Sequence, residues 1–312
     1  MNKDMGSLIE QAAQRMVQLR EAGVDFPETP ARVQPAPPQA SSQPTPRVAA
    51  SSRRVEIDLE ALALAGIVSP NAPRSRIADQ FRVIKRPLIA NALGKGAAVV
   101  AKGNLIVVTS ALPGEGKTFT AINLAMSIAT ELDCTVMLVD ADVSRPSVMR
   151  VLGLPPGPGL LDMVQDETLN MSDFLLRTNI DKLTLLPSGT QHPRATELLA
   201  SDAMTRLLDA MARRYPDRII VFDSPPLLLA TESQALASHM GQVVVVVQAE
   251  KTPQSTVLQA LATIESCPVK LMLLNQARTA ATEGYGYGYG YGYGYGYGAG
   301  ASSESGSEPQ LA

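Results

Sequence analysis

The sequence has few residues that form disulfides or bind metal ions: its 312 residues include two cysteines and two histidines. Cys134 and Cys267 both lie beside predicted strands, which favours buried, reduced thiols of a cytoplasmic protein over a disulfide. Together with His192 and His239, these cysteines supply too few ligands for a metal cluster. We therefore expect neither a disulfide-stabilised fold nor a structural metal centre.

The sequence also lacks a strong excess of charge and a long apolar run. Its formal net charge is −3 and no basic cluster stands out, which disfavours binding to nucleic acid or to an anionic membrane surface. The most apolar run, Val243 to Val247, is far too short to cross a bilayer, and the chain opens without the pattern of a secretory signal. These absences predict a soluble protein.

Tyrosine is almost absent until the last part of the chain. Tyr215 is the only tyrosine among the first 284 residues, and seven more then alternate with glycine, at Tyr285, Tyr287, Tyr289, Tyr291, Tyr293, Tyr295 and Tyr297. By itself, such a repeat is typical of a flexible spacer, or of an adhesive segment that places every ring on one face of a strand. It is also a cluster of phenolic hydroxyls that a phosphoryl donor site elsewhere in the chain would modify.

Composition divides the chain into four parts. We expect an N-terminal helix and Pro-rich linker at residues 1–52, a helical lead-in at 53–100, a catalytic domain at 101–280 and a disordered Tyr/Gly-rich tail at 281–312. Within the first part, apolar residues recur at helical spacing over residues 5–21, ahead of Gly23 and Pro27 as stop signals. This helix is equally consistent with a solvated surface helix and with a docking helix for a partner.

The region from Asn104 onward alternates between predicted strands and helices. Short runs of Val, Ile and Leu predict strands at residues 105–109, 136–139, 183–186, 219–222, 242–247 and 269–274. Helices are expected at residues 121–132, 196–213 and 253–264, and a further one at 75–92 precedes the first strand. Because the strand runs are apolar without alternation, both faces of the sheet are covered. The pattern predicts a three-layer α/β domain with a mainly parallel sheet.

A glycine-rich turn joins the first predicted strand to the helix that follows it. It reads Ser110-Ala111-Leu112-Pro113-Gly114-Glu115-Gly116-Lys117-Thr118. Its glycines allow positive φ angles that turn backbone N–H groups toward phosphate oxygens, and the helix adds the positive end of its dipole. Ala111 replaces the usual first glycine, but the strand–turn–helix context marks a P-loop. The domain is therefore predicted to be a P-loop NTPase, with Lys117 on the β- and γ-phosphates of ATP and Thr118 on Mg²⁺.

Acidic residues follow two other strands at the same edge of the sheet. Asp140 and Asp142 come after the second strand, and Asp223 follows a later strand in Asp223-Ser224-Pro225-Pro226. The C-terminal ends of parallel strands form the ligand-binding edge, and there an aspartate of the Walker B type holds Mg²⁺ through water. The alternative for Asp140 and Asp142 is a surface turn in which an aspartate caps the next helix.

Taken together, the P-loop, the Asp140-x-Asp142-x-x-Arg145 motif, the Asp223-Ser-Pro-Pro motif and the tyrosine-rich tail resemble a bacterial tyrosine kinase of exopolysaccharide synthesis (BY-kinase), in a form without its own transmembrane region. The likeness covers residues 75 to 298. Residues 79–88 are similar to the family's Glu-x-x-Arg-x-x-Arg oligomerisation helix, from which Asp79 and Lys85 depart while keeping the charge signs. Residues 192–201 resemble its Pro-x-Glu-Leu-Leu-x-Ser segment.

The resemblance implies an ATP- and Mg²⁺-dependent autokinase that phosphorylates the tyrosines of its tail and regulates exopolysaccharide polymerisation and export. We expect Asp140 to orient the acceptor phenol or to take its proton. Asn275 is a candidate adenine contact, with a plain turn residue as the alternative. The expected site is as follows: catalytic Lys117, Asp140 and Asp142; nucleotide contacts at Pro113, Gly114, Glu115, Gly116, Lys117, Thr118, Phe119 and Asn275; metal ligands Thr118, Asp142 and Asp223; oligomerisation residues Asp79, Arg82 and Lys85.

The resemblance also implies partners. These are further copies of the chain in a homo-oligomer such as a ring, and a membrane-embedded polysaccharide chain-length determinant that activates the kinase at the inner face of the membrane. A cognate tyrosine phosphatase is a third expected partner. Two alternatives use the same nucleotide site without tyrosine phosphorylation: a partition-type ATPase and a nucleotide-binding regulator. The first is disfavoured because Leu112 stands where those ATPases carry an extra lysine.

Overall fold

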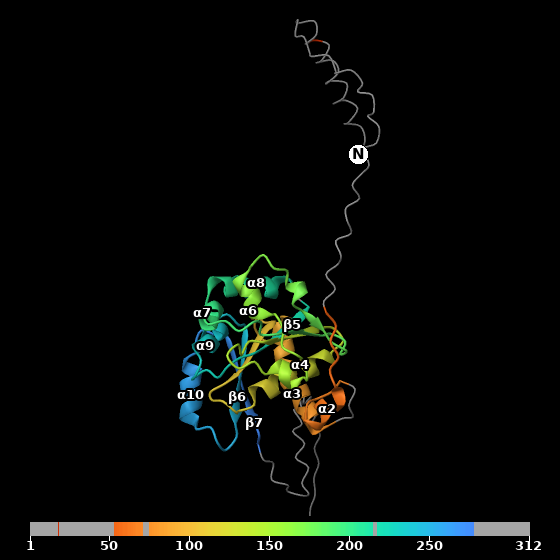
Figure 1. Ribbon diagram of the computed structural model, residues 1–312. Coiled ribbons are helices and arrows are strands. Elements are labelled where there is room, and N and C mark those ends of the chain that lie inside the picture. The colour runs from red at the N-terminus through yellow and green to blue at the C-terminus, as the bar shows by residue number, and fades with distance from the viewer. Residues whose placement is uncertain (1–17, 19–52, 71–74, 215–216, 278–312) are drawn as a thin grey trace, which may run out of the picture. The chain divides into compact units, whose positions relative to one another are not determined.

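The computed structural model describes residue 18 and residues 53–70, 75–214 and 217–277 (Figure 1). The predicted N-terminal helix, apart from residue 18, lies outside these ranges, as do the Pro-rich linker, Tyr215 and the tyrosine-rich tail. Among the residues described, none of the helices combines the length and the apolar character that crossing a membrane requires.

A seven-stranded sheet forms the centre of the domain, with the strand order β3-β4-β2-β5-β1-β6-β7. The strands are β1 (Leu105–Ser110), β2 (Thr135–Asp140), β3 (Leu176–Arg177), β4 (Leu183–Leu186), β5 (Arg218–Asp223), β6 (Gln242–Gln248) and β7 (Val269–Asn275). Neighbouring strands pair in parallel except β3, which is antiparallel to β4. The predicted mainly parallel sheet is confirmed. The short strand β3 was not predicted, because two residues carry no periodicity.

Helices cover both faces of the sheet (Figure 1). They are α2 (Leu59–Leu64), α3 (Arg76–Ala92), α4 (Lys117–Ala129), α5 (Val148–Val151), α6 (Leu160–Gln165), the 3₁₀ helix η1 (Met171–Asp173), α7 (Ala195–Leu199), α8 (Asp202–Arg214), α9 (Thr231–Ser238) and α10 (Gln254–Ala262). Helices α2, α3 and α4 share one core with Ile106 and Val108, whereas α6, α8, α9 and α10 share a second core with Leu105 and Val107. Successive residues of β1 thus enter opposite cores, as its unbroken apolar sequence predicts.

One predicted helix is divided in the structure, and another contains a proline. The helix expected at 196–213 is divided into α7 and α8 at Ser201, whose hydroxyl donates to the Leu198 carbonyl (2.6 Å) and accepts from the Met204 N–H (3.2 Å). Such a side chain ends one helix and caps the next. The helix expected at 75–92 is formed as α3, which continues through Pro87. The missing N–H removes a single hydrogen bond, and the fully buried Leu88 beside it holds this turn in the core.

The three residues of α3 that were expected to take part in oligomerisation have different environments. Asp79 and Arg82 form an ion pair one turn apart, and about half of each side chain is exposed. Lys85 is instead buried, with its ammonium 2.8 Å from Glu131 Oε1 and 3.0 Å from the Thr130 hydroxyl, and it also donates to the Ser127 carbonyl. Partial burial opposes ionisation of Glu131, but the hydrogen bond and the charge of Lys85 outweigh it and lower the pKa of that carboxyl. Lys85 therefore joins α3 to α4 within one chain and does not lie on an exposed assembly surface.

We expect Lys85→Met to lower the free energy of unfolding by about 2–3 kcal/mol, because the change leaves Glu131 and the Ser127 carbonyl without their shared donor. The estimate is at the low end for a broken buried pair because Glu131 keeps some exposure to water. Urea unfolding followed by circular dichroism measures the change. Lys95→Met, which alters an exposed lysine, is the matched control, and equal stability of the two variants would contradict the structural role.

Candidate active site

The P-loop lies at the C-terminal end of β1, between the ends of β5 and β6. Gly114 and Gly116 have φ angles of 82° and 94°, in the left-handed region that favours glycine. Helix α4 begins at Lys117 directly after Gly116, so its first N–H groups point toward the same edge of the sheet. The backbone thus forms a positive concave surface at a helix N-terminus, which is suited to binding phosphate.

The side chain of Glu115 fixes the position of the P-loop through hydrogen bonds. Its carboxylate is buried, and it accepts hydrogen bonds from the Leu112 N–H (2.6 Å), the Gln248 N–H (3.3 Å) and the Thr252 hydroxyl. The side chain therefore joins the loop to the segment after β6, and only the backbone of Glu115 remains for a nucleotide contact. The sequence did not reveal this role, because two of its three partners, Gln248 and Thr252, lie more than 130 residues away.

The chain segment after β7 also contacts the P-loop. Asn275 donates a hydrogen bond from Nδ2 to the Glu115 carbonyl (2.9 Å), and Gln276 donates from Nε2 to the Gly114 carbonyl (3.1 Å). A Cβ atom at Gly116 would lie 2.1 Å from Nδ2 of Asn275, so this approach requires glycine. Because two P-loop carbonyls are bound on this side, the loop is fixed where its N–H groups form the phosphate-binding surface. The adenine contact expected of Asn275 stays a prediction.

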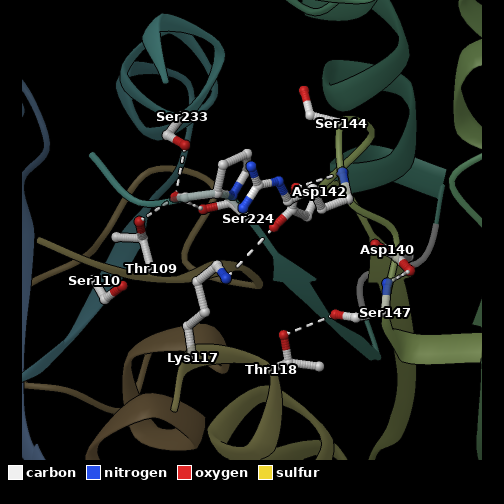
Figure 2. Close-up of polar contacts among 12 residues, drawn as sticks. Thr109, Ser110, Lys117, Thr118, Asp140, Asp142, Ser144, Ser147, Ser224 and Ser233 are labelled. Atoms are coloured by element: carbon white, nitrogen blue, oxygen red, sulfur yellow. Dashed lines mark hydrogen bonds and ion pairs between the residues drawn. The ribbon is translucent and has the colours of Figure 1, made fainter. Parts of the chain in front are cut away.

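Lys117 and Thr118 project from the start of α4 toward acidic and hydroxyl side chains across the site (Figure 2). The Lys117 ammonium lies 3.4 Å from Asp142 Oδ2, and the Thr118 hydroxyl lies 3.0 Å from the Ser147 hydroxyl. Both interactions use groups that a bound nucleotide would need. The lysine and the threonine are therefore already directed into the site, with Asp142 as the charge partner of the lysine.

Asp140 and Asp142 follow β2 and have different hydrogen-bond partners. One carboxylate oxygen of Asp140, Oδ2, accepts from the N–H groups of Ser147 and Val148, both at 3.0 Å, at the start of α5. The alternative interpretation expected such a cap, but it placed the aspartate in a surface turn, whereas Asp140 is buried. The other oxygen, Oδ1, is buried and has no hydrogen-bond partner among the described residues. Asp142 accepts from the Arg145 N–H at 3.1 Å. Capping thus uses only one oxygen of Asp140 and leaves the second available for chemistry.

Asp223 lies beside Asp140, its register partner across β2 and β5. It is fully buried, and within the part of the chain that the structure describes neither of its carboxylate oxygens has a hydrogen-bond partner. The loop that follows is fixed because the Pro225 carbonyl accepts from the hydroxyls of Thr109 (2.8 Å) and Ser233 (2.6 Å) (Figure 2). A buried ionisable group without partners costs stability, so Asp223 is a candidate for holding a cation.

The electrostatics of the three aspartates agree with a binding site for a cation. Burial, reinforced by the charge of Asp140, raises the pKa of Asp223 to about 8. Burial also raises the pKa of Asp140 to about 6, with Asp142 adding to the effect and the N–H of Val148 opposing it. For Asp142, burial raises the pKa although the nearby Lys117 opposes the rise. A cation at this edge of the sheet would favour the ionised form of all three carboxyls.

The residues present fit a magnesium ion better than a metal held entirely by protein. Among the described residues, no group of three or more His, Cys, Asp or Glu side chains is arranged to hold a metal by itself. Mg²⁺ takes one or two carboxylates and completes its octahedral shell with water and phosphate oxygens. The unpartnered oxygens of Asp223, with the Thr118 hydroxyl and Asp142 nearby, match that requirement.

The described residues contain free, buried Cys134 and Cys267, in agreement with reduced thiols.

Two features of the site were missed in the sequence. Glu232, in the first turn of α9, is buried, and it accepts a hydrogen bond from the Ser144 hydroxyl at 3.1 Å. Its negative charge is among the causes that raise the pKa of Asp142. Beside Ser144, an open hollow of about 560 Å³ is lined by Val143 and by residues 191–193, 195 and 196. No motif marks Glu232, because an acidic residue in a first helical turn is common for reasons of helix capping alone.

Three other residues that the sequence analysis singled out lie in or next to the P-loop. Pro113 is exposed at the tip of the loop, and Phe119 is half-buried against the core that contains α3 and α4. Leu112 is partly buried and packs against the opposite core. The structure thus brings together the P-loop, Asp140, Asp142 and Asp223, whereas the seven tail tyrosines lie outside the described residues.

Comparison with known proteins identifies related chains. The family described as "AAA domain" matches residues 103–276. "Tyrosine-protein kinase YwqD" of Bacillus subtilis (strain 168) is 29% identical over 206 residues, which cover 66% of this chain and 83% of the relative. "Succinoglycan biosynthesis transport protein ExoP" of Rhizobium meliloti (strain 1021) is 31% identical over 194 residues, which cover 61% of this chain and 23% of the relative.

A solved structure shows the same likeness. The crystal structure of the VpsO kinase domain matches with a TM-score of 0.54 and 25% sequence identity, over 64% of this chain and 96% of that domain. The predicted resemblance to bacterial tyrosine kinases is therefore confirmed, and so is the P-loop NTPase fold.

Proposed function

Since the chain belongs to the AAA domain family, we propose that it uses ATP to phosphorylate tyrosines of its own C-terminal repeat, Tyr285 to Tyr297. The observation that carries the proposal is the combination of a formed P-loop with two buried aspartates, Asp140 and Asp223, that have carboxylate oxygens without hydrogen-bond partners among the described residues. The same chain also contains seven clustered tyrosines. A relative with the name tyrosine-protein kinase supports the same activity.

Each group of the site has a role in holding ATP. The N–H groups of residues 114–119 surround the phosphates, with Pro113 beside them at the tip of the loop, and the Lys117 ammonium binds between the β- and γ-phosphates after leaving Asp142. Asn275, at the end of β7, is the proposed contact for the adenine. Thr118, Asp142 and Asp223 would hold Mg²⁺, of which Asp223 acts through water. When bound, the ion neutralises charge on the β- and γ-phosphates.

Phosphoryl transfer requires an acceptor oxygen in line with the bond that breaks. The phenolic oxygen of a tyrosine forms a bond to the γ-phosphorus while the bond from that phosphorus to the β–γ bridging oxygen breaks, releasing ADP. We assign the phenolic proton to Oδ1 of Asp140, which is buried and unpartnered among the described residues. The hollow beside Ser144, next to Asp142, offers space for the incoming tyrosine segment.

The proposed cellular role is regulation of exopolysaccharide polymerisation and export at the inner face of the cell membrane. The name of the relative ExoP, a succinoglycan biosynthesis transport protein, supports this setting. The activator would be a membrane-embedded chain-length determinant, and a tyrosine phosphatase would reverse the modification. Of the three α3 residues proposed for self-assembly into an oligomer, Asp79 and Arg82 are exposed, whereas Lys85 is buried.

Intact-mass spectrometry after incubation with Mg·ATP tests the proposal. The full chain is expected to gain the mass of several phosphate groups, one for each tyrosine that is modified. A variant with all seven tail tyrosines changed to phenylalanine is expected to gain none, although it binds nucleotide equally well.

A second outcome would favour one of the alternatives. If the full chain hydrolyses ATP without gaining phosphate, and the cytoplasmic end of a chain-length determinant does not restore transfer, the protein is an ATPase or a nucleotide-dependent regulator. Phosphate gained equally by the phenylalanine variant would place the acceptor outside the repeat.

A further inference from the structure

A large apolar groove lies between α3 and β7, and at one end its lining includes Asn275 and Gln276, which contact the P-loop. Its volume is about 660 Å³. The apolar groove is lined chiefly by Ile77, Phe81, Ile84 and Pro87 of α3 and by Leu271 and Leu273 of β7. No charged side chain lines it among the described residues. A surface of this kind, on a domain that exposes few other apolar residues together, indicates a binding site.

The groove runs along an open edge of the sheet. Within the described residues β7 pairs with β6 on one side and has no strand on the other. Four consecutive residues, 271–274, line the groove, so it follows the edge of the strand and is not confined to one of its faces. Met272 and Leu274 are each 65% exposed, and Val83 of α3, also in the lining, is 73% exposed. An edge with free backbone groups and apolar side chains is a template for an added strand.

The chain itself supplies a segment that fits this edge. The described residues end at Ala277, which is part of the groove lining. Residues 278–284 then separate it from Tyr285, a stretch that spans up to about 25 Å when extended and so allows the repeat to return along β7. Tyrosine and glycine alternate with a period of two, so a strand would direct every ring to one face and glycine to the other.

We propose that the repeat at residues 285–297 docks in the apolar groove as a strand antiparallel to β7 while its tyrosines are unmodified. The rings then face Ile77, Phe81 and Ile84 of α3, and the glycines lie on the other face, where Met272 and Leu274 are exposed. Backbone hydrogen bonds to the free edge of β7 fix the direction of the segment, and ring burial supplies the apolar contact.

Phosphorylation would release the segment. A phosphotyrosine carries about −1.5 to −2 charge at neutral pH, and the groove presents no lysine or arginine to pair with it. This step rests on the proposed kinase function, whereas docking of the unmodified repeat does not. The groove would thus hold unmodified acceptors away from the site and would not take back modified ones.

Hydrogen–deuterium exchange of the full chain tests the docking. Amides of residues 269–275 are expected to exchange about tenfold faster when all seven tail tyrosines are changed to serine, which corresponds to about 90% occupancy in the unmodified chain. The variant with seven phenylalanines keeps the rings and should retain slow exchange. Val83→Asp, at an exposed position of the groove, should also accelerate exchange of β7, whereas Leu258→Asp, at a 58% exposed position of α10, should not.

Two results would overturn the proposal. Equal exchange of β7 in the unmodified chain and in the serine variant would show that the repeat does not occupy the groove. Slow exchange that disappears when the protein is diluted would show that a second copy of the chain, not the chain's own repeat, covers the edge.

Synthetic peptides separate docking from kinase activity. A peptide with the sequence of residues 284–298, added to the serine variant, should restore slow exchange of β7, and the same peptide phosphorylated on every tyrosine should not. Equal effects of the two peptides would contradict release by phosphorylation. Because the peptides carry their modification from synthesis, this result does not depend on whether the chain is itself a kinase.

Discussion

Lys117→Met is expected to lower the rate of tyrosine phosphorylation by about 10³-fold, the effect of removing one preorganised positive group from a phosphoryl-transfer site. The ammonium lies at the start of α4, where it is 3.4 Å from Asp142 and largely shielded from water. Methionine keeps the length and packing of the side chain, so the fold should remain. Single-turnover transfer from radiolabelled ATP measures the loss.

The two lysines of the domain interior provide a matched comparison for this result. Lys117→Met should lose phosphoryl transfer and keep its unfolding free energy within about 0.5 kcal/mol, because its partner Asp142 retains the Arg145 N–H. Lys85→Met should show the reverse, since that side chain contacts α4 and lies outside the site. If Lys117→Met retained more than a tenth of the transfer rate, Lys117 would not be the group that binds the transferred phosphate.

The fold and the centre of the site could be predicted from the sequence because their signals are local. The buried strands β1, β5 and β6 read as unbroken apolar runs, and the glycine-rich turn before Lys117 has its full pattern within nine residues. Asp140 and Asp223 could be placed together because parallel strands end at the same edge.

Other features could not be predicted, because they depend on contacts between distant parts of the chain. The Glu115 carboxylate turns away from the nucleotide surface only because Gln248 and Thr252 meet it there. Lys85 fits the charge pattern of an exposed helix face, and its burial follows from where α4 ends at Ala129, just before Glu131. The apolar groove likewise exists only once α3 lies beside β7.

Asp223→Asn is expected to stabilise the protein in the absence of metal and nucleotide. The carboxyl is fully buried, has no hydrogen-bond partner among the described residues, and has a pKa raised from 3.8 to about 8. The native state therefore binds a proton more tightly than the unfolded state does. Removing the ionisable group should raise the free energy of unfolding at pH 8 by about 2 kcal/mol, less than the full linkage energy because a buried amide also lacks partners.

The effect of Asp223→Asn on the free energy of unfolding should depend on pH. Between pH 4 and pH 8, roughly, the unfolded chain loses the Asp223 proton while the native protein retains it, so the stability of the unmodified protein falls as pH rises. Below that range both states are protonated and the cost disappears. The stabilisation by Asp223→Asn should therefore be small at pH 5 and largest at pH 8. Asp140, whose pKa is raised to about 6, contributes a slope of the same sign in both proteins.

Thermal unfolding at pH 5 and pH 8, either in EDTA or with Mg·ATP in place of EDTA, measures both the effect of the substitution and the effect of the ion. The midpoint of Asp223→Asn at pH 8 should be higher by about 4–8 °C, at roughly 2–4 °C per kcal/mol for a domain of this size. Mg·ATP should raise the midpoint of the unmodified protein much more than that of the variant, because the ion removes the cost of the buried carboxylate. Asp217→Asn, at an exposed position just before β5, should change neither. A variant less stable than the unmodified protein at pH 8 would show that Asp223 is stabilised as a carboxylate within the fold and is not kept for a cation.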